Sequence, residues 1–283
     1  MPRSQILSKT EHDARKYLMF LYGIPGVGKT TFASSIPGHH IIESEAGTEG
    51  VQCYSDAVQD YSEFKVFINE IITDKKRGWK TEAGKAVRPI EMIVIDTYDA
   101  LMRSTCRWLV ENEKFIIGGK ATKFSNADDV PFGKCFSRAS DQLIFIINRL
   151  RQLGFGVLLL SHMKDRLQKW RGQDVTFVGP DVTPTSAKRI IGECGAVGFF
   201  TAREEVKKVE GSLTPEYVVE NKNVRYIEWN GTFTKPAKHR LPNFPEVTIV
   251  ERIGGWQTYL RQFEEAWKIS ETEISAPKTM MTE

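Results

Sequence analysis

The chain has 283 residues, of which 41% are hydrophobic and 27% are charged, and these proportions exclude a disordered or fibrous protein and are typical of a globular one. A formal net charge of +3 permits a nucleic-acid partner but does not require one. The four cysteines are far apart and include no C-x-x-C pair, so neither a zinc site nor a disulfide framework is expected.

The sequence shows no membrane or secretory segment. No apolar run is long enough to cross a membrane, and the polar N-terminus lacks the apolar stretch of a secretory signal. Scattered cysteines favour a reducing compartment, so we expect a cytoplasmic protein. The length predicts one large domain, residues 17–270, between a polar N-terminal segment, residues 1–16, and a flexible tail, residues 271–283.

An apolar strand predicted at residues 17–22 leads into the most informative motif of the chain. The segment Gly23-Ile-Pro-Gly-Val-Gly-Lys-Thr30 reads G-x-x-x-x-G-K-T, and the residues after it predict a helix to Ser35. A strand, this loop and a helix together indicate a phosphate-binding loop. Its glycines let backbone N–H groups face a phosphate, Lys29 would neutralise the outer phosphates of ATP, and Thr30 would bind Mg²⁺. The predicted nucleotide-binding residues are Gly23, Pro25, Gly26, Val27, Gly28, Lys29, Thr30 and Thr31.

A second and a third strand follow, separated by a helix. Residues 39–43 predict the second strand, and apolar residues at helical spacing predict an amphipathic helix at 60–75, before an exposed loop or hairpin at 76–88. The apolar third strand, 90–96, ends in Asp96. A carboxylate there would hold Mg²⁺ through water, as the partner of the phosphate-binding loop.

The second half of the chain predicts two more buried strands and two long loops. Loops at 113–135 and 163–187 lie on either side of a helix at 137–153 and a wholly apolar fourth strand at 155–161. A fifth strand at 196–201 and a last helix at 256–268 are separated by short stretches that predict antiparallel strands, at 203–209, 216–220, 224–229 and 246–250.

These elements predict an α/β fold with a mostly parallel sheet flanked by helices, and with antiparallel strands added near the C-terminus. Ligands bind at the carboxyl ends of the strands in such sheets, and ATP hydrolysis there needs a group that orients water. Glu43, Glu45 and Glu49 follow the second strand; we choose Glu45, although a solvated acidic loop explains these residues equally well. His162, after the fourth strand, is either a γ-phosphate sensor or a histidine hydrogen-bonded at a strand end.

Three segments make the chain resemble the RecA-like ATPases. They are the loop 23–30, the strand and acidic motif Ile41-Ile-Glu-Ser-Glu-Ala46, and Ile93-Val-Ile-Asp-Thr-Tyr-Asp-Ala-Leu101, which is similar to a Walker B strand and turn. Within that superfamily the chain most resembles a phage group of RecA-like nucleotide-binding proteins, some of which are single-strand-annealing or recombination ATPases. The group's features appear here as Tyr22–Thr31, Ser161-His162 and Ala237-Lys-His-Arg240, and the likeness covers about residues 15–250. It implies a RecA-like P-loop NTPase core with Glu45 as the catalytic base.

The resemblance also implies a second copy of the chain. In RecA-like assemblies a Lys-x-Arg element reaches a neighbour's ATP, so Lys238 and Arg240 would stabilise charge in the site of another subunit of a homo-oligomer. His239 departs from the acidic or amide residue that is usual between them. An exposed basic turn before Pro242 is the alternative interpretation.

Single-stranded DNA is the partner that the resemblance implies. In the family it lies along the loops that follow the Walker B helix and the sensor strand, which here fall within 113–135 and 163–187. Basic groups with an aromatic residue between them suit phosphate contacts and base stacking, although two solvated loops remain the alternative. The predicted DNA-binding residues are Lys164, Arg166, Lys169, Trp170 and Arg171.

Two functional hypotheses follow. The first is a Mg²⁺-dependent, DNA-stimulated ATPase of phage-type recombination, annealing or replication, in the host cytoplasm if a phage encodes it. The second is a nucleotide-switched loader that recruits a single-strand-binding or replication protein and hydrolyses little ATP. A small-molecule kinase is disfavoured, because no lid with clustered arginines is evident. The predicted catalytic residues are Glu45, Lys29, His162, Lys238 and Arg240, with Thr30 and Asp96 as metal ligands.

Overall fold

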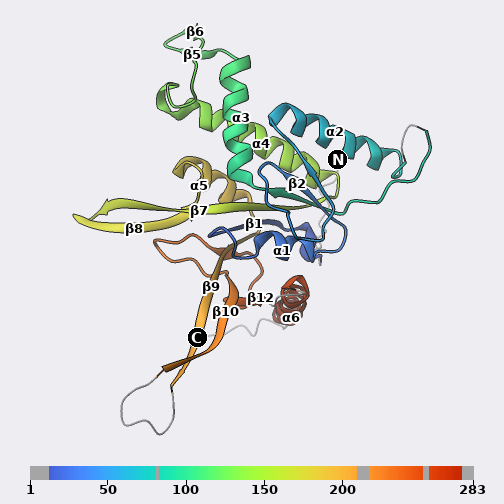
Figure 1. Ribbon diagram of the computed structural model, residues 1–283, viewed down its shortest axis with the longest axis vertical. Coiled ribbons are helices and arrows are strands. Elements are labelled where there is room, and N and C mark those ends of the chain that lie inside the picture. The colour runs from blue at the N-terminus through green and yellow to red at the C-terminus, as the bar shows by residue number, and fades with distance from the viewer. Residues whose placement is uncertain (1–12, 81–82, 209–216, 251–254, 276–283) are drawn as a thin grey trace, which may run out of the picture.

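A parallel sheet forms the centre of the computed structural model, which describes residues 13–80, 83–208, 217–250 and 255–275 (Figure 1). Its strands lie in the order β9-β1-β7-β4-β2, and all neighbours in this set run parallel. The predicted α/β fold with a mostly parallel sheet is therefore confirmed. The strands are β1 (Leu18–Gly23), β2 (His39–Glu43), β4 (Met92–Asp96), β7 (Gly156–Trp170) and β9 (Ala196–Lys208).

Further strands extend this sheet at both edges. On one side β3 (Ser55–Ala57) pairs in parallel with β2. On the other side β10 (Tyr217–Glu228), β11 (Lys238–His239) and β12 (Val247–Val250) pair antiparallel to their neighbours. The antiparallel additions predicted near the C-terminus are confirmed, but as fewer and longer strands, since the stretches at 216–220 and 224–229 both belong to β10.

Helices cover both faces of the sheet, which is why its central strands are apolar throughout (Figure 1). Leu18, Phe20 and Tyr22 of β1 face one core, and Met19 and Leu21 face the other. The first core is closed by α2 (Tyr61–Lys76), α3 (Tyr98–Asn112), α4 (Lys134–Gln152) and α5 (Pro184–Glu193), and the second by α1 (Lys29–Ser34) and α6 (Gly255–Ser275). No helix among the described residues is long and apolar enough to span a membrane.

The prediction of a loop over 163–187 is wrong. Strand β7 continues past the sheet to Trp170, turns at Arg171 and Gly172, and returns as β8 (Gln173–Pro180). Both turn residues have positive φ, 50° and 82°, as a two-residue hairpin turn requires. The hairpin projects away from the body of the molecule (Figure 1). Residues 184–193 then form α5, whose N-cap Thr183 accepts a hydrogen bond from the backbone N–H of Ser186.

Other segments also differ from the prediction. The loop at 113–135 contains a small hairpin, β5 (Phe115–Ile117) and β6 (Lys120–Thr122), and a 3₁₀ turn, Pro131–Gly133. Helix α3 and strand β3 have no counterpart among the predicted ranges. The last helix continues to Ser275, beyond the predicted start of the tail. The division of the chain into three parts stays a prediction, because residues 1–12 and 276–283 lie outside the described residues.

Candidate functional site

The phosphate-binding loop joins β1 to α1 at the carboxyl edge of the sheet. Gly23 lies so close to the neighbouring strand that a Cβ atom there would be 2.0 Å from the backbone oxygen of Phe200. Gly28 has a φ of 102°, a conformation that favours glycine, and α1 begins at the next residue, Lys29. A cavity of about 280 Å³ opens beside the loop. It is lined by residues of the loop and the start of α1, of the segments after β2 and β4, and of β7, among them Lys29, Thr30, Glu45, Asp96 and His162.

Lys29 is buried inside its own loop. Its ammonium donates hydrogen bonds to the backbone oxygens of Gly23 and Ile24, at 3.0 and 2.9 Å. Burial lowers the pKa of Lys29, and the carboxylates of Asp96 and Asp99 partly oppose this shift. The cation is therefore held where a phosphate, which offers a full negative charge, would be a better partner than two carbonyls.

Thr30 and Asp96, the predicted ligands of Mg²⁺, lie next to each other at the cavity. The Thr30 hydroxyl donates to Oδ2 of Asp96 at 2.7 Å. Burial raises the pKa of Asp96, and the Thr30 hydrogen bond and Lys29 oppose this. Hydroxyl and carboxylate oxygens are the hard ligands that Mg²⁺ prefers, so the two side chains fit this ion.

Glu45 reaches the cavity from the loop after β2, which is next to β4 in the sheet. Its Oε2 accepts a hydrogen bond from Thr97, at 3.3 Å, and pairs with Arg103, at 3.7 Å. Thr97 is also the N-cap of α3, where its side chain accepts from the backbone N–H of Ala100. Of the three acidic candidates, Glu45 is the one that lines the cavity.

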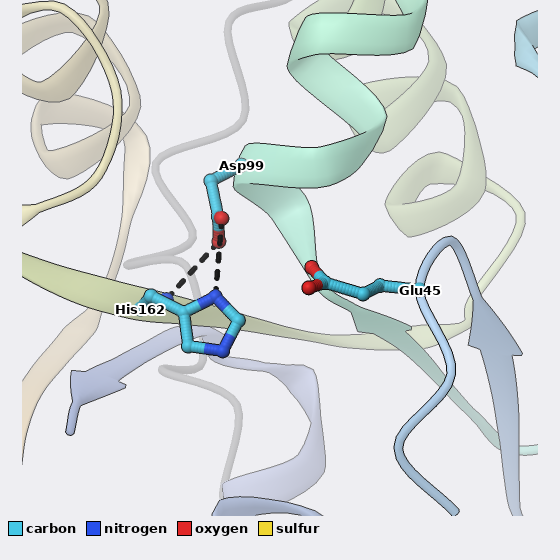
Figure 2. Close-up of side chains that lie close together, drawn as sticks. All are labelled: Glu45, Asp99 and His162. Carbon is cyan, nitrogen blue, oxygen red and sulfur yellow. Dashed lines mark hydrogen bonds and ion pairs between the residues drawn. The ribbon is translucent and has the colours of Figure 1, made fainter. Parts of the chain in front are cut away.

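His162 is fixed by a buried carboxylate that the sequence analysis did not identify. Asp99, in the first turn of α3, is 1% exposed. Its Oδ1 accepts from the backbone N–H of His162 at 3.0 Å, and its Oδ2 lies 3.2 Å from Nδ1 (Figure 2). A carboxylate oxygen accepts hydrogen bonds, so we assign a proton to Nδ1, and Nε2 has no hydrogen-bond partner among the described residues. The order Asp96-Thr-Tyr-Asp99 was visible in the sequence, but its meaning depends on where α3 places the second carboxylate.

Arg103 is the second residue that the sequence analysis missed. It lies one turn after Asp99 on α3, and its guanidinium contacts three carboxylates: Asp99 at 3.2 Å, Asp181 at 3.6 Å and Glu45 at 3.7 Å. Within the described residues, Glu45, Asp99 and His162 form the one group whose side chains are close enough to share a metal ion. Arg103 already supplies positive charge there, so we assign this trio to hydrogen bonding instead of to a second metal.

The predicted DNA-binding residues all belong to the β7–β8 hairpin. Lys164 pairs with Asp181 at 3.1 Å, and Arg166 donates to the backbone oxygens of Pro180 and Val182 at 3.0 and 2.5 Å. Trp170 is 47% exposed and lies against the exposed ring of Phe233, with a centroid distance of 4.6 Å. Lys169 and Arg171 are exposed near the hairpin tip. Phe233 had no signal in the sequence, since it is distant along the chain from the hairpin.

Lys238 and Arg240 lie away from the cavity. β11 pairs with the first residues of β9, Ala196 and Val197, whereas the phosphate-binding loop leaves β1 beside Phe200. Arg240 donates to the backbone oxygen of Gly192 at 2.8 Å. Both basic residues are therefore at the amino edge of the sheet, where they cannot reach the site of their own chain.

Arg225 of β10 is a basic residue that does lie near the loop. A Cβ atom at Gly28 would be 2.6 Å from its Nη1. The guanidinium therefore packs against the loop on the side that Gly28 leaves open. Neither the motif nor the spacing pointed to this residue, because β10 reaches the loop only through its pairing with β9.

Comparison with known proteins identifies one family. The sequence profile of the family described as AAA domain matches residues 15–241, a range that contains every site residue named above. No curated protein matches the chain. Among solved structures the chain is similar to the flagellar accessory protein FlaH from Methanocaldococcus jannaschii, with 10% sequence identity, a TM-score of 0.39, and coverage of 85% of this chain and 88% of that chain.

Proposed function

The chain belongs to the AAA domain family, and from this premise we propose that it is a Mg²⁺-dependent ATPase that acts on single-stranded DNA in phage-type recombination, annealing or replication. Membership of the family indicates nucleotide binding and hydrolysis. One observation carries the proposal further: a single cavity is lined by Lys29, Thr30, Glu45, Asp96 and His162, which all lie at the carboxyl edge of the parallel sheet. These groups can hold and neutralise a terminal phosphate and can orient the water that attacks it.

Each residue has a part that its chemistry and position support. Lys29 would exchange its two carbonyl partners for the outer phosphates of ATP. Thr30 and Asp96 would hold Mg²⁺, which neutralises phosphate charge when it is bound. Glu45 orients the attacking water and accepts its proton. His162, with the Nδ1 proton held by Asp99, has Nε2 free, which accepts a hydrogen bond from the attacking water when the ring is neutral and donates one to the γ-phosphate when the ring is protonated.

The DNA part of the proposal depends on the hairpin. Lys164, Lys169 and Arg171 are exposed basic residues around the half-exposed ring of Trp170. Such a surface suits a backbone of phosphates with bases stacked on the ring. Arg166 is less available, because two backbone oxygens already engage its guanidinium.

ATP hydrolysis by the purified chain, measured with and without single-stranded DNA, tests this function directly. Lys29→Ala serves as the blank, since it removes the phosphate-binding cation. Stimulation by DNA that disappears in the blank supports the proposal. ATP binding without any response to DNA contradicts the DNA part and favours the loader described below.

Glu45→Gln is the sharpest single substitution at the site. We expect turnover to fall by about 10²–10⁴-fold, the usual contribution of a positioned proton acceptor. ATP affinity should be retained, because the polar contacts of Glu45 are with Thr97 and Arg103 and not with the phosphate-binding loop. Hydrolysis and binding of a fluorescent ATP analogue measure the two effects. Glu49→Gln, in the same acidic loop, is the matched control; near-normal turnover by Glu45→Gln would refute the assignment.

A nucleotide-switched loader is the second candidate, favoured by one feature of the surface. A groove of about 490 Å³ lies between α2 and α4, with apolar walls that include Ile68, Phe145 and Ile146. Phe145 is 68% exposed. A replication protein bound at this groove, together with slow turnover that DNA does not change, would favour the loader over the DNA-stimulated ATPase.

A further inference from the structure

A continuous chain of charged groups joins the water-activating carboxylate to the base of the β7–β8 hairpin. Glu45 pairs with Arg103, Arg103 pairs with Asp181, and Asp181 pairs with Lys164, at 3.7, 3.6 and 3.1 Å. Arg103 also pairs with Asp99, the carboxylate that holds His162. We propose that Arg103 is a positioning residue through which an anionic strand on the hairpin controls Glu45. This inference rests on the proposed function, since it concerns how DNA would regulate the same ATPase site.

Arg103 is suited to this role because three carboxylates share its guanidinium and because its side chain is exposed enough to move. Its side chain is 55% exposed, and Asp181 and Glu45 are also partly exposed, whereas Asp99 is fully buried. A guanidinium has five donors in a planar fork, so it can keep its contact with buried Asp99 while it shifts between the other two carboxylates. The contact with Asp99 therefore acts as the pivot.

Asp181 connects this pivot to the hairpin. Its Oδ1 contacts Lys164 and its Oδ2 contacts Arg103, and its backbone N–H donates to the oxygen of His162 at 2.9 Å. A nucleic-acid phosphate that binds Lys164 competes with Asp181 for this cation. Asp181 then attracts Arg103 more strongly, because opposite charges at close range in a partly buried site interact more than in bulk water.

The consequence falls on Glu45. In the structure, Thr97 and Arg103 both engage its Oε2, so the carboxylate is held against α3. A group that activates water must lie within hydrogen-bond reach of it and be correctly oriented. Withdrawal of Arg103 toward Asp181 leaves Glu45 free to turn to the water, and hydrolysis accelerates when DNA is bound.

Two substitutions, one at each end of the Arg103–Asp181 ion pair, test whether this pair regulates hydrolysis or only stabilises the fold. Arg103→Gln removes the restraint, so the rate without DNA should rise and added DNA should change it little. Asp181→Asn removes the group that attracts Arg103, so the rate without DNA should stay low and stimulation should again be lost, although Lys164 remains available to DNA. We expect DNA to raise the hydrolysis rate of the wild type by about 5- to 150-fold, which is the usual size of an allosteric effect.

The experiment measures ATP hydrolysis with and without single-stranded DNA, DNA affinity by fluorescence anisotropy, and melting temperature for each full-length variant. Arg107→Gln, one turn further along α3 and exposed, is the matched control and should behave as the wild type. A wild-type ratio of stimulated to unstimulated rate in Arg103→Gln, or equal losses of both rates, would overturn the inference while the ATPase proposal stands. No response to DNA in the wild type itself would overturn the inference together with the DNA part of the proposed function.

Discussion

Asp99 shows how much of the site depends on one buried carboxylate. It accepts both donors of His162 and pairs with Arg103, and it opposes the loss of charge on buried Lys29. A fully buried carboxylate is stable only when such partners compensate its charge. Asp99 therefore fixes the position of His162, and it does so without lining the cavity itself.

Asp99→Asn should impair turnover more than nucleotide binding. The amide of asparagine must direct an NH₂ group at one of two donors, and a buried unmatched polar group costs about 1–3 kcal/mol. We expect turnover to fall about tenfold or more, since about 1.4 kcal/mol of barrier corresponds to a factor of ten, with ATP affinity retained. Steady-state hydrolysis and nucleotide binding measure this, and Glu111→Gln, exposed on the same helix, is the control.

A double substitution distinguishes positioning of His162 from a general loss of structure. If Asp99 acts through the histidine, Asp99→Asn should change little once His162→Gln is present, because the two effects belong to one pair. Additive losses in the double variant would contradict the assigned role.

His239 makes the free energy of unfolding depend on pH, and its contribution falls as the pH falls. Its ring stacks on Phe244 at 3.7 Å, its Nε2 lies 3.0 Å from the Tyr259 hydroxyl, and the backbone N–H of Leu241 donates to Nδ1. Burial lowers the pKa of His239 to about 4. Between this value and the ordinary 6.5 the unfolded chain binds more protons, so the stability present above pH 6.5 is lost as the pH falls toward 4.

Replacement of His239 should remove this contribution to the change of stability between pH 7 and pH 5. From pH 7 to pH 5 the wild type should lose about 2 kcal/mol more than His239→Phe, because a tenfold change in an acid dissociation constant corresponds to about 1.4 kcal/mol. Denaturant unfolding at both pH values measures the difference, in which the carboxylates common to both proteins cancel. Parallel losses in the two proteins would show that folding does not lower the pKa of His239. The unusual residue in the Lys-x-Arg segment is thus explained by packing.

Sequence reasoning reached different residues of the site for different reasons. Lys29 and Thr30 follow from local spacing, since one loop determines the backbone around them. Asp96 and His162 follow from their places at the ends of apolar strands. Asp99 and Arg103 could not be predicted, because their roles arise only when α3 packs beside β7 and brings helix and strand residues together.

At the scale of elements, the β7–β8 hairpin is the part of the fold that the sequence concealed. A buried strand is recognised by alternation or by a continuous apolar run, but this hairpin is exposed over most of its length and so has neither. The parallel strands β1, β4 and the first part of β7 were predictable because both their faces are buried. The hairpin is central to the proposed function because β7 runs without interruption from the core, past His162, to Trp170.

Trp170→Ala tests the hairpin as a DNA-binding element. Stacking of one base on an aromatic ring is worth about 1–3 kcal/mol, so affinity for single-stranded DNA should fall by about 5- to 150-fold. The slope of affinity against salt should not change, since the indole neutralises no phosphate. Fluorescence anisotropy at several salt concentrations measures both quantities.

Matched variants separate stacking from charge in that experiment. Lys169→Ala should reduce the salt slope by about 0.7, while Phe145→Ala, an exposed aromatic residue on α4, should leave DNA affinity unchanged. Unaltered affinity in Trp170→Ala would exclude the hairpin tip as a stacking surface.

At the scale of the molecule, the two edges of the sheet carry different chemistry. The carboxyl edge holds the phosphate-binding loop, Asp96 and His162, and the hairpin leaves from the same edge. The amino edge holds Lys238 and Arg240 beside the start of β9. Local sequence signals predicted the strands, but the order β9-β1-β7-β4-β2 depends on contacts between residues far apart in the chain. That order is what separates the two basic residues from the site in their own subunit.

This separation yields a prediction about assembly. If Lys238 and Arg240 complete the site of a neighbour, subunits associate head to tail, with the amino edge of one facing the carboxyl edge of the next. A trans arginine is worth about 10³–10⁵ in rate, so Arg240→Ala should be nearly inactive alone, as should Glu45→Gln. Mixed together, they should recover activity, because Glu45→Gln subunits supply an intact Arg240 to Arg240→Ala subunits with an intact Glu45. The measurement is ATP hydrolysis by mixtures of the two variants, each with a different tag. Co-purification of the two tags proves that mixed assemblies form. Mixed assemblies without recovered activity would place the Lys-x-Arg segment outside the ATPase site.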